Sequence, residues 1–154
     1  MSVRSRAMPT LDQLTAADLR AVVRCFADAL VDHKEPINRL NVYPVPDGDT
    51  GTNMSLTLKS VMEEVDAAPD EMEPLCKAIA HGSLMGARGN SGVILSGVLR
   101  GLSNGFKDRE AVDALGLVAA FSAASEAAYG AVGRSLKFHE HPCSQRLPIQ
   151  LRQR

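Results

Sequence analysis

The sequence has no tryptophan, few aromatic residues and no long uninterrupted run of apolar residues. Without such a run we expect no membrane span, and without an apolar stretch and cleavage site after the first residues we expect no signal peptide. Three cysteines cannot all pair and lack metal-site spacing, so we expect reduced thiols in a cytoplasmic protein. Apolar and polar residues do not alternate over any segment in the way that would predict a strand.

What the sequence does have is the length and composition of one globular domain. Its 154 residues are 45% hydrophobic and 23% charged, which excludes a fibre, a collagen-like repeat and a fully disordered chain. The net charge of −1 hides a basic stretch over residues 134–154, which holds five Lys or Arg and one Glu. These charges are scattered and have no interleaved aromatic residues, so we expect a solvated chain end and no nucleic-acid partner.

Apolar residues recur at helical spacing through most of the chain. Such stripes predict helices over about 19–30, 54–65, 75–85, 93–99 and 110–129. We therefore expect an all-α fold, a bundle of antiparallel helices joined by short loops. The last stripe consists of Val112, Leu115, Val118 and Phe121.

A few residues mark the expected helix ends. Thr15 followed by Asp18 is a helix-start pattern. Pro36 lies near the point where the first helix should stop, and Gly101 or Gly105 should close the fourth.

The first of two unusual segments, residues 41–54, reads NVYPVPDGDTGTNM. Asp47 and Asp49 flank a glycine, so a sharp turn can bring their carboxylates together. Two close carboxylates repel each other unless a cation bridges them, which favours a hard metal such as Mg²⁺.

Polar residues continue from this turn into the next helix. Thr50, Thr52 and Asn53 fall at its expected first turn, where free N–H groups and a partial positive charge attract phosphate. The segment thus favours a metal–nucleotide site. The alternative is a surface turn in which Asp49 or Thr50 only caps the helix.

The second segment, residues 81–92, reads HGSLMGARGNSG. Four glycines and two serines between helical stretches offer backbone N–H groups and hydroxyls, as a loop around phosphate would. The spacing matches neither a P-loop nor a dinucleotide fingerprint. The alternative is a helix–helix crossing at which small residues allow a close approach.

Together, residues 41–54 and the GARGNSGVILS of residues 86–96 resemble the N-terminal domain of the kinase component of bacterial fatty acid kinase. That domain is related to the nucleotide-binding L subunit of dihydroxyacetone kinase (DhaL). The resemblance implies an eight-helix barrel that binds ATP or ADP and two Mg²⁺ ions at one end. Asp47 and Asp49 would hold the metals. Asn41 stands where the dihydroxyacetone kinase relatives have a third aspartate, and it would be a weaker ligand.

The resemblance also implies the roles of the other polar residues. Thr50, Thr52 and Asn53 would lie near the phosphates, and the nucleotide would be lined by Gly89, Asn90 and Ser91. The implied reaction is transfer of the γ-phosphoryl group by metal neutralisation and positioning. Its acceptor would be a fatty acid carboxylate, presented by a fatty-acid-binding partner protein of the DegV type.

The resemblance covers about residues 9–133, which we expect to form the kinase domain. Family members continue into further helices, whereas residues 134–154 show no helical period and contain two prolines. We therefore expect a truncated domain that lacks its last helices, followed by a disordered tail. Apolar faces left exposed would favour self-association into a homo-oligomer.

Three other interpretations remain open from the sequence. One is phosphorylation of dihydroxyacetone, against which Asn41 in place of an aspartate argues. The second is a non-catalytic nucleotide-binding or docking module, because binding could survive a loss of C-terminal helices that should harm catalysis. The third is a fragment without function, which the composition of the tail favours.

Overall fold

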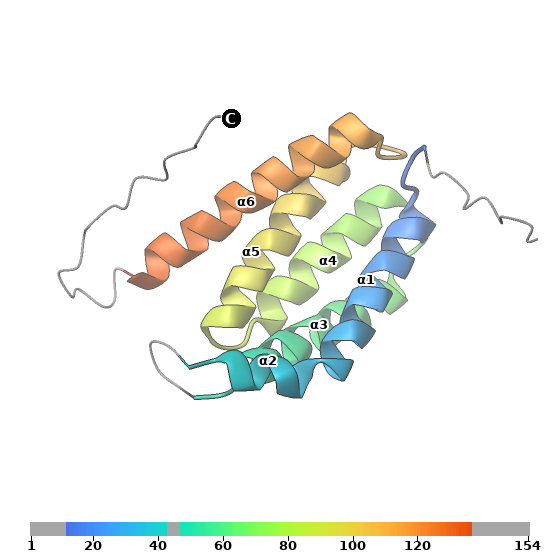
Figure 1. Ribbon diagram of the computed structural model, residues 1–154. Coiled ribbons are helices and arrows are strands. Elements are labelled where there is room, and N and C mark those ends of the chain that lie inside the picture. Colours follow the sequence, from blue (N-terminus) through green and yellow to red (C-terminus); the bar gives the residue numbers. More distant parts are fainter. Residues whose placement is uncertain (1–11, 43–46, 137–154) are drawn as a thin grey trace, which may run out of the picture.

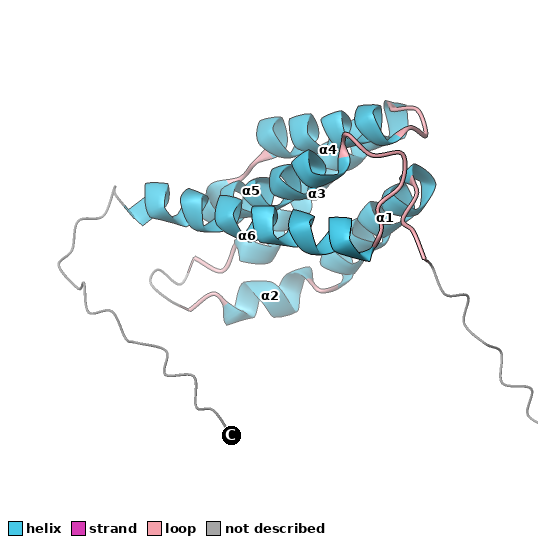
Figure 2. Cartoon of the chain, turned by 90° about the horizontal axis from the view of Figure 1, so that it is seen from above, coloured by secondary structure: helices cyan, strands magenta, loops and turns pink. Residues whose placement is uncertain are grey.

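The computed structural model describes residues 12–42 and 47–136, and these residues form six helices (Figure 1). The helices are α1 (Ala16–Asp32), α2 (Lys34–Leu40), α3 (Thr50–Ala67), α4 (Met72–Gly86), α5 (Gly89–Phe106) and α6 (Ala114–Leu136). From α3 to α6, consecutive helices lie side by side and run antiparallel, while α1 and α2 pack against α3 (Figures 1 and 2). The described residues contain one isolated β-bridge and no longer strand, so the predicted all-α fold is confirmed.

The start of α1 follows the pattern predicted from the sequence. The Asp18 N–H donates a hydrogen bond to the Thr15 hydroxyl oxygen at 3.3 Å, and the Thr15 N–H donates to the Asp18 carboxylate at 3.0 Å. This reciprocal pair is a capping box, which satisfies N–H groups that have no partner inside the helix.

The end of α1 differs from the prediction. The helix stops at Asp32, and the seven-residue helix α2 begins at Lys34 with Pro36 in its first turn. Proline is tolerated there because first-turn N–H groups have no acceptor within the helix. The apolar pattern did not predict α2, since seven residues are too few to show a helical period.

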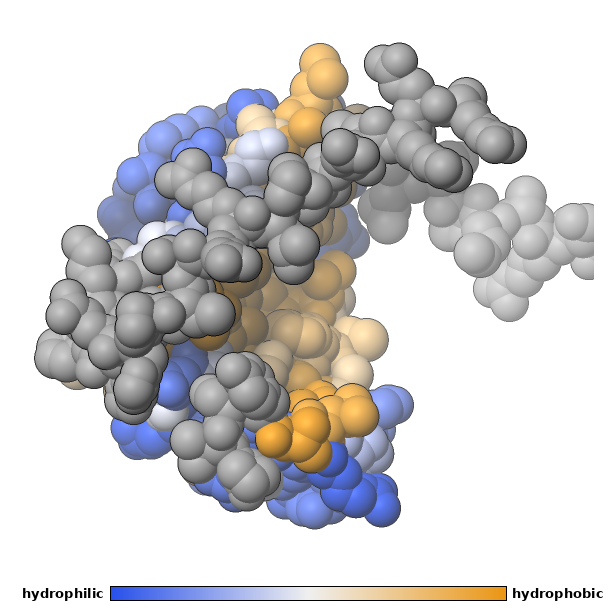
Figure 3. Space-filling model, turned by 60° about the vertical axis from the view of Figure 1, so that its left-hand side comes forward, coloured by the Kyte–Doolittle hydropathy of each residue, from blue (hydrophilic) through white to orange (hydrophobic). Residues whose placement is uncertain are grey.

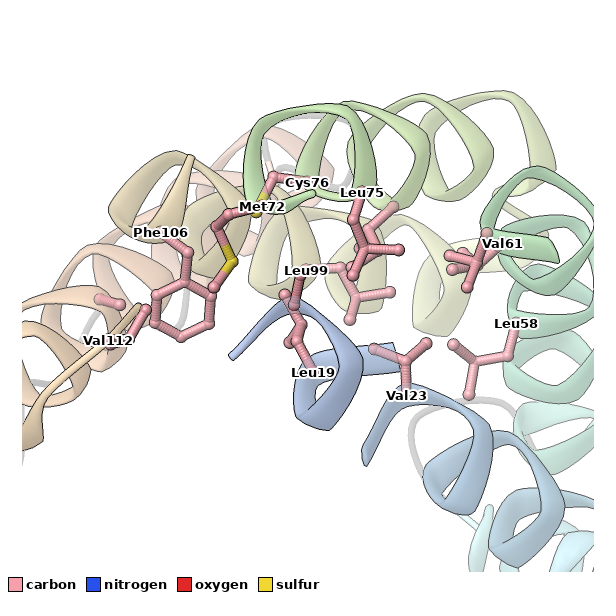
Figure 4. Close-up of a cluster of buried hydrophobic side chains, with 14 of the residues drawn as sticks. Leu19, Val23, Leu58, Val61, Met72, Leu75, Cys76, Leu99, Phe106 and Val112 are labelled. Atoms are coloured by element: carbon pink, nitrogen blue, oxygen red, sulfur yellow. The ribbon is translucent and has the colours of Figure 1, made fainter. Parts of the chain in front are cut away.

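Helices α1, α3, α4 and α5 enclose the hydrophobic core. In Figure 4, Leu19 and Val23 of α1 point toward Leu58 of α3 and Leu99 of α5. Leu75 of α4 is fully buried in the same cluster. Burial of one such side chain contributes about 1.5–3 kcal/mol, so these helices hold one another in place through apolar contacts.

Small residues form the interface between α5 and α6. The sequence suggested that Gly101 or Gly105 ends this helix, but α5 continues to Phe106. A Cβ atom at Gly101 would lie 2.5 Å from the Cα of Ala124, and one at Gly105 would lie 2.6 Å from the Cβ of Ala120. The glycines therefore allow the two helices to approach closely.

This interface explains why the apolar stripe predicted for α6 does not face the core. Leu115, Val118 and Phe121 are 79%, 64% and 57% exposed. Val112 is buried, but it precedes the helix, where its backbone pairs with that of Leu14. A close helix pair is built from the smallest residues, so the larger apolar residues of α6 are turned away from α5.

Among the described residues, α1 and α6 do not pack against each other. Figure 3 shows apolar residues gathered in a hollow between more polar outer surfaces. Exposed apolar side chains occur on both helices, among them Val22 and Phe26 of α1 and Leu117 and Phe121 of α6. We call the space between α1 and α6 the open seam. Exposed apolar surface of this kind was expected, whereas truncation and self-association stay predictions.

Two further expectations concern α6. Its residues Ala114–Val132 are long and apolar enough to cross a membrane, judged by length and composition alone. One such helix is weak evidence, because core helices of many proteins pass the same test, so the absence of a membrane span and a cytoplasmic location stay predictions. The helix also continues to Leu136, beyond the expected domain boundary at residue 133. The rest of the predicted tail, residues 137–154, lies outside the described residues.

Candidate functional site

The two segments singled out in the sequence meet where α3 and α5 begin. Thr50 is the first residue of α3, and Gly89 is the first residue of α5. The Ser91 hydroxyl lies 3.5 Å from the carbonyl oxygen of Thr50. A Cβ atom at Gly89 would collide with the side-chain amide of Asn53. The first turns of α3 and α5 are therefore in direct contact.

The turn before α3 presents two carboxylates. Gly48, with φ of +62°, provides the sharp bend between Asp47 and Asp49. The Asn41 side-chain amide donates a hydrogen bond to the Asp47 carboxylate, which brings together two of the three predicted metal ligands. Asp49 occupies the N-cap position of α3, but its side chain makes no capping hydrogen bond.

No described basic side chain forms an ion pair with Asp47 or Asp49. Their oxygen atoms are hard ligands, and Mg²⁺ typically takes one or two protein carboxylates together with phosphate and water. The described residues contain no cluster of three or more His, Cys, Asp or Glu side chains suited to a metal. The two carboxylates and the amide oxygen of Asn41 are the kinds of oxygen ligand that Mg²⁺ takes together with phosphate oxygens and water.

Helix α2 fixes the first turn of α3 through contacts that the sequence did not predict. The Asn38 amide donates to the Thr52 hydroxyl at 3.1 Å, and the Thr52 N–H donates to the Asn38 amide oxygen at 3.1 Å. A Cβ atom at Gly51 would collide with the carbonyl oxygen of Lys34. Thr52, predicted to lie near phosphate, is thus engaged by Asn38.

The beginning of α5 is joined to α3 by a second unpredicted residue, Thr57. Its hydroxyl donates to the carbonyl oxygen of Asn53 at 2.8 Å and accepts from the Arg88 N–H at 3.2 Å. Thr57 is fully buried. The sequence held only an indirect sign of this contact: Gly92, in the predicted phosphate segment, is a small residue at the place where α5 approaches Thr57 of α3 closely.

The predicted phosphate segment, residues 81–92, divides into two structural parts. Residues up to Gly86 belong to α4, and a Cβ atom at Gly82 would lie 2.8 Å from the Cα of Val61 in α3. This half is the close helix crossing that was the alternative interpretation. Only Ala87 and Arg88 form a loop, and the remaining residues start α5.

Both helix starts have the electrostatic character of an anion site. Neither Asp49 nor Arg88, the N-cap residues of α3 and α5, forms a side-chain capping hydrogen bond. First-turn N–H groups carry a partial positive charge that attracts phosphate. Carboxylates suited to a cation thus lie beside two helix starts suited to an anion, which is the arrangement that a metal–phosphate group requires.

Known proteins are similar to this chain over a range that includes Asp47, Asp49 and Gly89. Residues 44–139 match the family described as DAK2 domain. Protein YloV of Bacillus subtilis is 42% identical over 133 residues, which make up 86% of this chain and 23% of YloV. Uncharacterized protein SSP1546 of Staphylococcus saprophyticus is 46% identical over 107 residues, 69% of this chain and 19% of that protein. The chain spans about a fifth of the length of these relatives.

Proposed function

The chain belongs to the DAK2 domain family, and from this premise we propose that it binds ATP with Mg²⁺ where α3 and α5 begin. DAK2 domains are kinase-related domains of the DhaL type and generally bind ADP or ATP. The observation that carries the proposal is the contact between the first turns of these two helices, beside the carboxylates of Asp47 and Asp49.

In this proposal Asp47, Asp49 and Asn41 would hold two Mg²⁺ ions. Asn41 would have to turn its amide oxygen toward the metal, since its NH₂ group donates to Asp47 in this structure. Bound Mg²⁺ would neutralise the charge on the transferred phosphoryl group. The carboxylates would position the metal, and the reaction would need no side chain as a nucleophile.

The phosphates would lie against the two helix starts. The N–H groups at Thr50 and around Gly89 are the proposed donors, with the Ser91 hydroxyl and the side chains of Asn53 and Asn90 beside them. Thr52 acts indirectly in this arrangement, because Asn38 occupies both its N–H and its hydroxyl.

We further propose a fatty acid carboxylate as the acceptor, presented by a separate fatty-acid-binding protein of the DegV type. The support is the likeness of residues 41–54 and 86–96 to the kinase component of bacterial fatty acid kinase. Asn41 in place of an aspartate argues against dihydroxyacetone as the acceptor.

Thermal unfolding with ATP, in the presence of Mg²⁺ or of EDTA, tests the nucleotide site. A ligand at a hundredfold excess over its dissociation constant stabilises the folded state by about 2.7 kcal/mol, which raises the melting temperature by about 5–10 °C at this size. We expect this shift to require both ATP and Mg²⁺ and to be lost in the variant Asp47→Asn/Asp49→Asn.

The matched control is Asp108→Asn/Glu110→Gln. It removes two exposed negative charges at the other end of α5, so the shift should persist. A shift that survives in the Asp47→Asn/Asp49→Asn variant, or no shift for the unaltered protein, would contradict the proposal. If ATP binds, an assay of acyl phosphate formation with a fatty-acid-loaded partner separates a kinase from a binding module.

A further inference from the structure

A single buried hydroxyl connects the two helix starts. Thr57 lies one helical turn after Asn53 in α3 and is 0% exposed. Its hydroxyl donates to the Asn53 carbonyl oxygen at 2.8 Å, a contact that threonine commonly makes within helices. It also accepts from the Arg88 N–H at 3.2 Å, and this second bond crosses to the residue immediately before α5.

The first turn of α5 rests directly on this hydroxyl. A Cβ atom at Gly92 would lie 2.5 Å from the Thr57 hydroxyl oxygen. A side chain larger than hydrogen would fit there only if the Thr57 side chain or one of the helices moved. The Thr57 oxygen therefore sets the distance between the beginning of α5 and the body of α3.

From this geometry we infer that Thr57 is a positioning residue for nucleotide phosphate, an inference that rests on the proposed nucleotide site. Thr57 cannot itself touch a phosphate, because it is fully buried. It acts through Arg88 and Asn53, which fix where the N–H groups of α5 point relative to those of α3. A group held by both helix starts at once depends on that spacing, and a displacement of about 1 Å can reduce a reaction rate by about a hundredfold.

Three variants separate positioning from a structural role. Thr57→Val keeps the shape but removes the hydroxyl, whereas Thr57→Ser keeps the hydroxyl. Ser103→Ala is the matched control. It also removes a buried hydroxyl, but from α5, about 21 Å along that helix from Gly89. The measurements are the dissociation constant of Mg·ADP by calorimetry below the melting temperature, and hydrogen exchange of the Arg88 amide.

We expect Thr57→Val to bind Mg·ADP about tenfold more weakly and to exchange the Arg88 amide faster. Thr57→Ser should restore both properties to near those of the unaltered protein, and Ser103→Ala should change neither. A merely structural role would lower the melting temperature of Thr57→Val but leave the affinity of the folded protein unchanged. Rescue by serine therefore supports positioning.

If Thr57→Val does not fold, Gly92→Ala tests the same contact from α5, because its Cβ atom would push against the retained hydroxyl. It should weaken Mg·ADP binding to a similar degree, and unchanged affinity would overturn the inference. If Thr57→Val binds Mg·ADP as tightly as the unaltered protein while Asp47→Asn/Asp49→Asn does not bind it, the role of Thr57 would be overturned but the proposed site would stand. Failure of the unaltered protein to bind Mg·ADP would overturn the proposed function and this inference together.

Discussion

The close approach of α5 and α6 makes Gly101 a sensitive test of the packing described above. Alanine at this position would place its Cβ atom 2.5 Å from the Cα and 2.8 Å from the backbone N of Ala124. Ordinary contacts between such atoms begin at 3.4 Å. Both neighbouring atoms belong to the backbone, so no side-chain rotation can relieve the collision. The helices would have to separate locally by about 1 Å.

The expected destabilisation follows from two opposing effects. Overpacking a closely fitted interface costs about 1–3 kcal/mol, and backbone neighbours place Gly101→Ala near the upper end. Alanine returns about 1 kcal/mol, because its helix propensity exceeds that of glycine. The net loss is about 2 kcal/mol, which lowers the melting temperature by about 4–8 °C for a chain of this length.

Gly130→Ala, in the same helix pair, is the matched control. A Cβ atom there would meet nothing within 4 Å, so only the gain in helix propensity applies. We expect its melting temperature to rise by about 2–4 °C. Thermal unfolding followed by circular dichroism measures both variants. A Gly101→Ala protein as stable as the unaltered chain would refute the close packing of α5 against α6.

Three further predictions follow from individual contacts. Asn38→Ala should destabilise the protein by about 1–3 kcal/mol in urea unfolding, because it leaves the Thr52 N–H and hydroxyl without partners; a loss below about 0.5 kcal/mol would contradict this. Burial raises the pKa of the Cys76 thiol to about 11, so iodoacetamide at pH 8 should modify exposed Cys25 in the native protein and reach Cys76 only after unfolding, as peptide mass spectrometry can show. Hydrogen bonds from the Thr15 hydroxyl and, to a lesser degree, from the Thr15 N–H lower the pKa of Asp18 from 3.8. The contact therefore stabilises the fold above pH 3.8, and this stabilisation is lost as the pH falls through the lower pKa of the folded state. Melting curves of Asp18→Asn should lack this part of the acid dependence.

The helices that the sequence predicts well are those whose signals are local. The capping box of Thr15 and Asp18 marks the start of α1, and Leu58, Val61 and Val65 form one buried stripe of α3. Such residues act within one helix, so their spacing is enough to recognise them. The orientation of α6 could not be predicted in this way, because its packing face is set by the glycines of α5.

The candidate site shows the same division. The turn around Asp47 and Asp49 was recognised because two carboxylates flanking a glycine form a local pattern, whereas α5 begins at Gly89, before the helix over about 93–99 that the apolar stripe predicted. Asn38 and Thr57 were not recognised, since an asparagine in a short helix and a threonine in an amphipathic one are ordinary there. Their importance arises from contacts between helices that no local spacing encodes.

The position of the site within the bundle determines what holds it together. α3, α4 and α5 pack pairwise against one another, so the two helix starts belong to a closed group of three helices. The open seam between α1 and α6 lies outside this group, and α6 contacts α5 through small residues at Gly97, Gly101 and Gly105. The spacing of the helix starts therefore depends on the packing of these three helices, on the Thr57 hydroxyl and on the contact of Ser91 with Thr50.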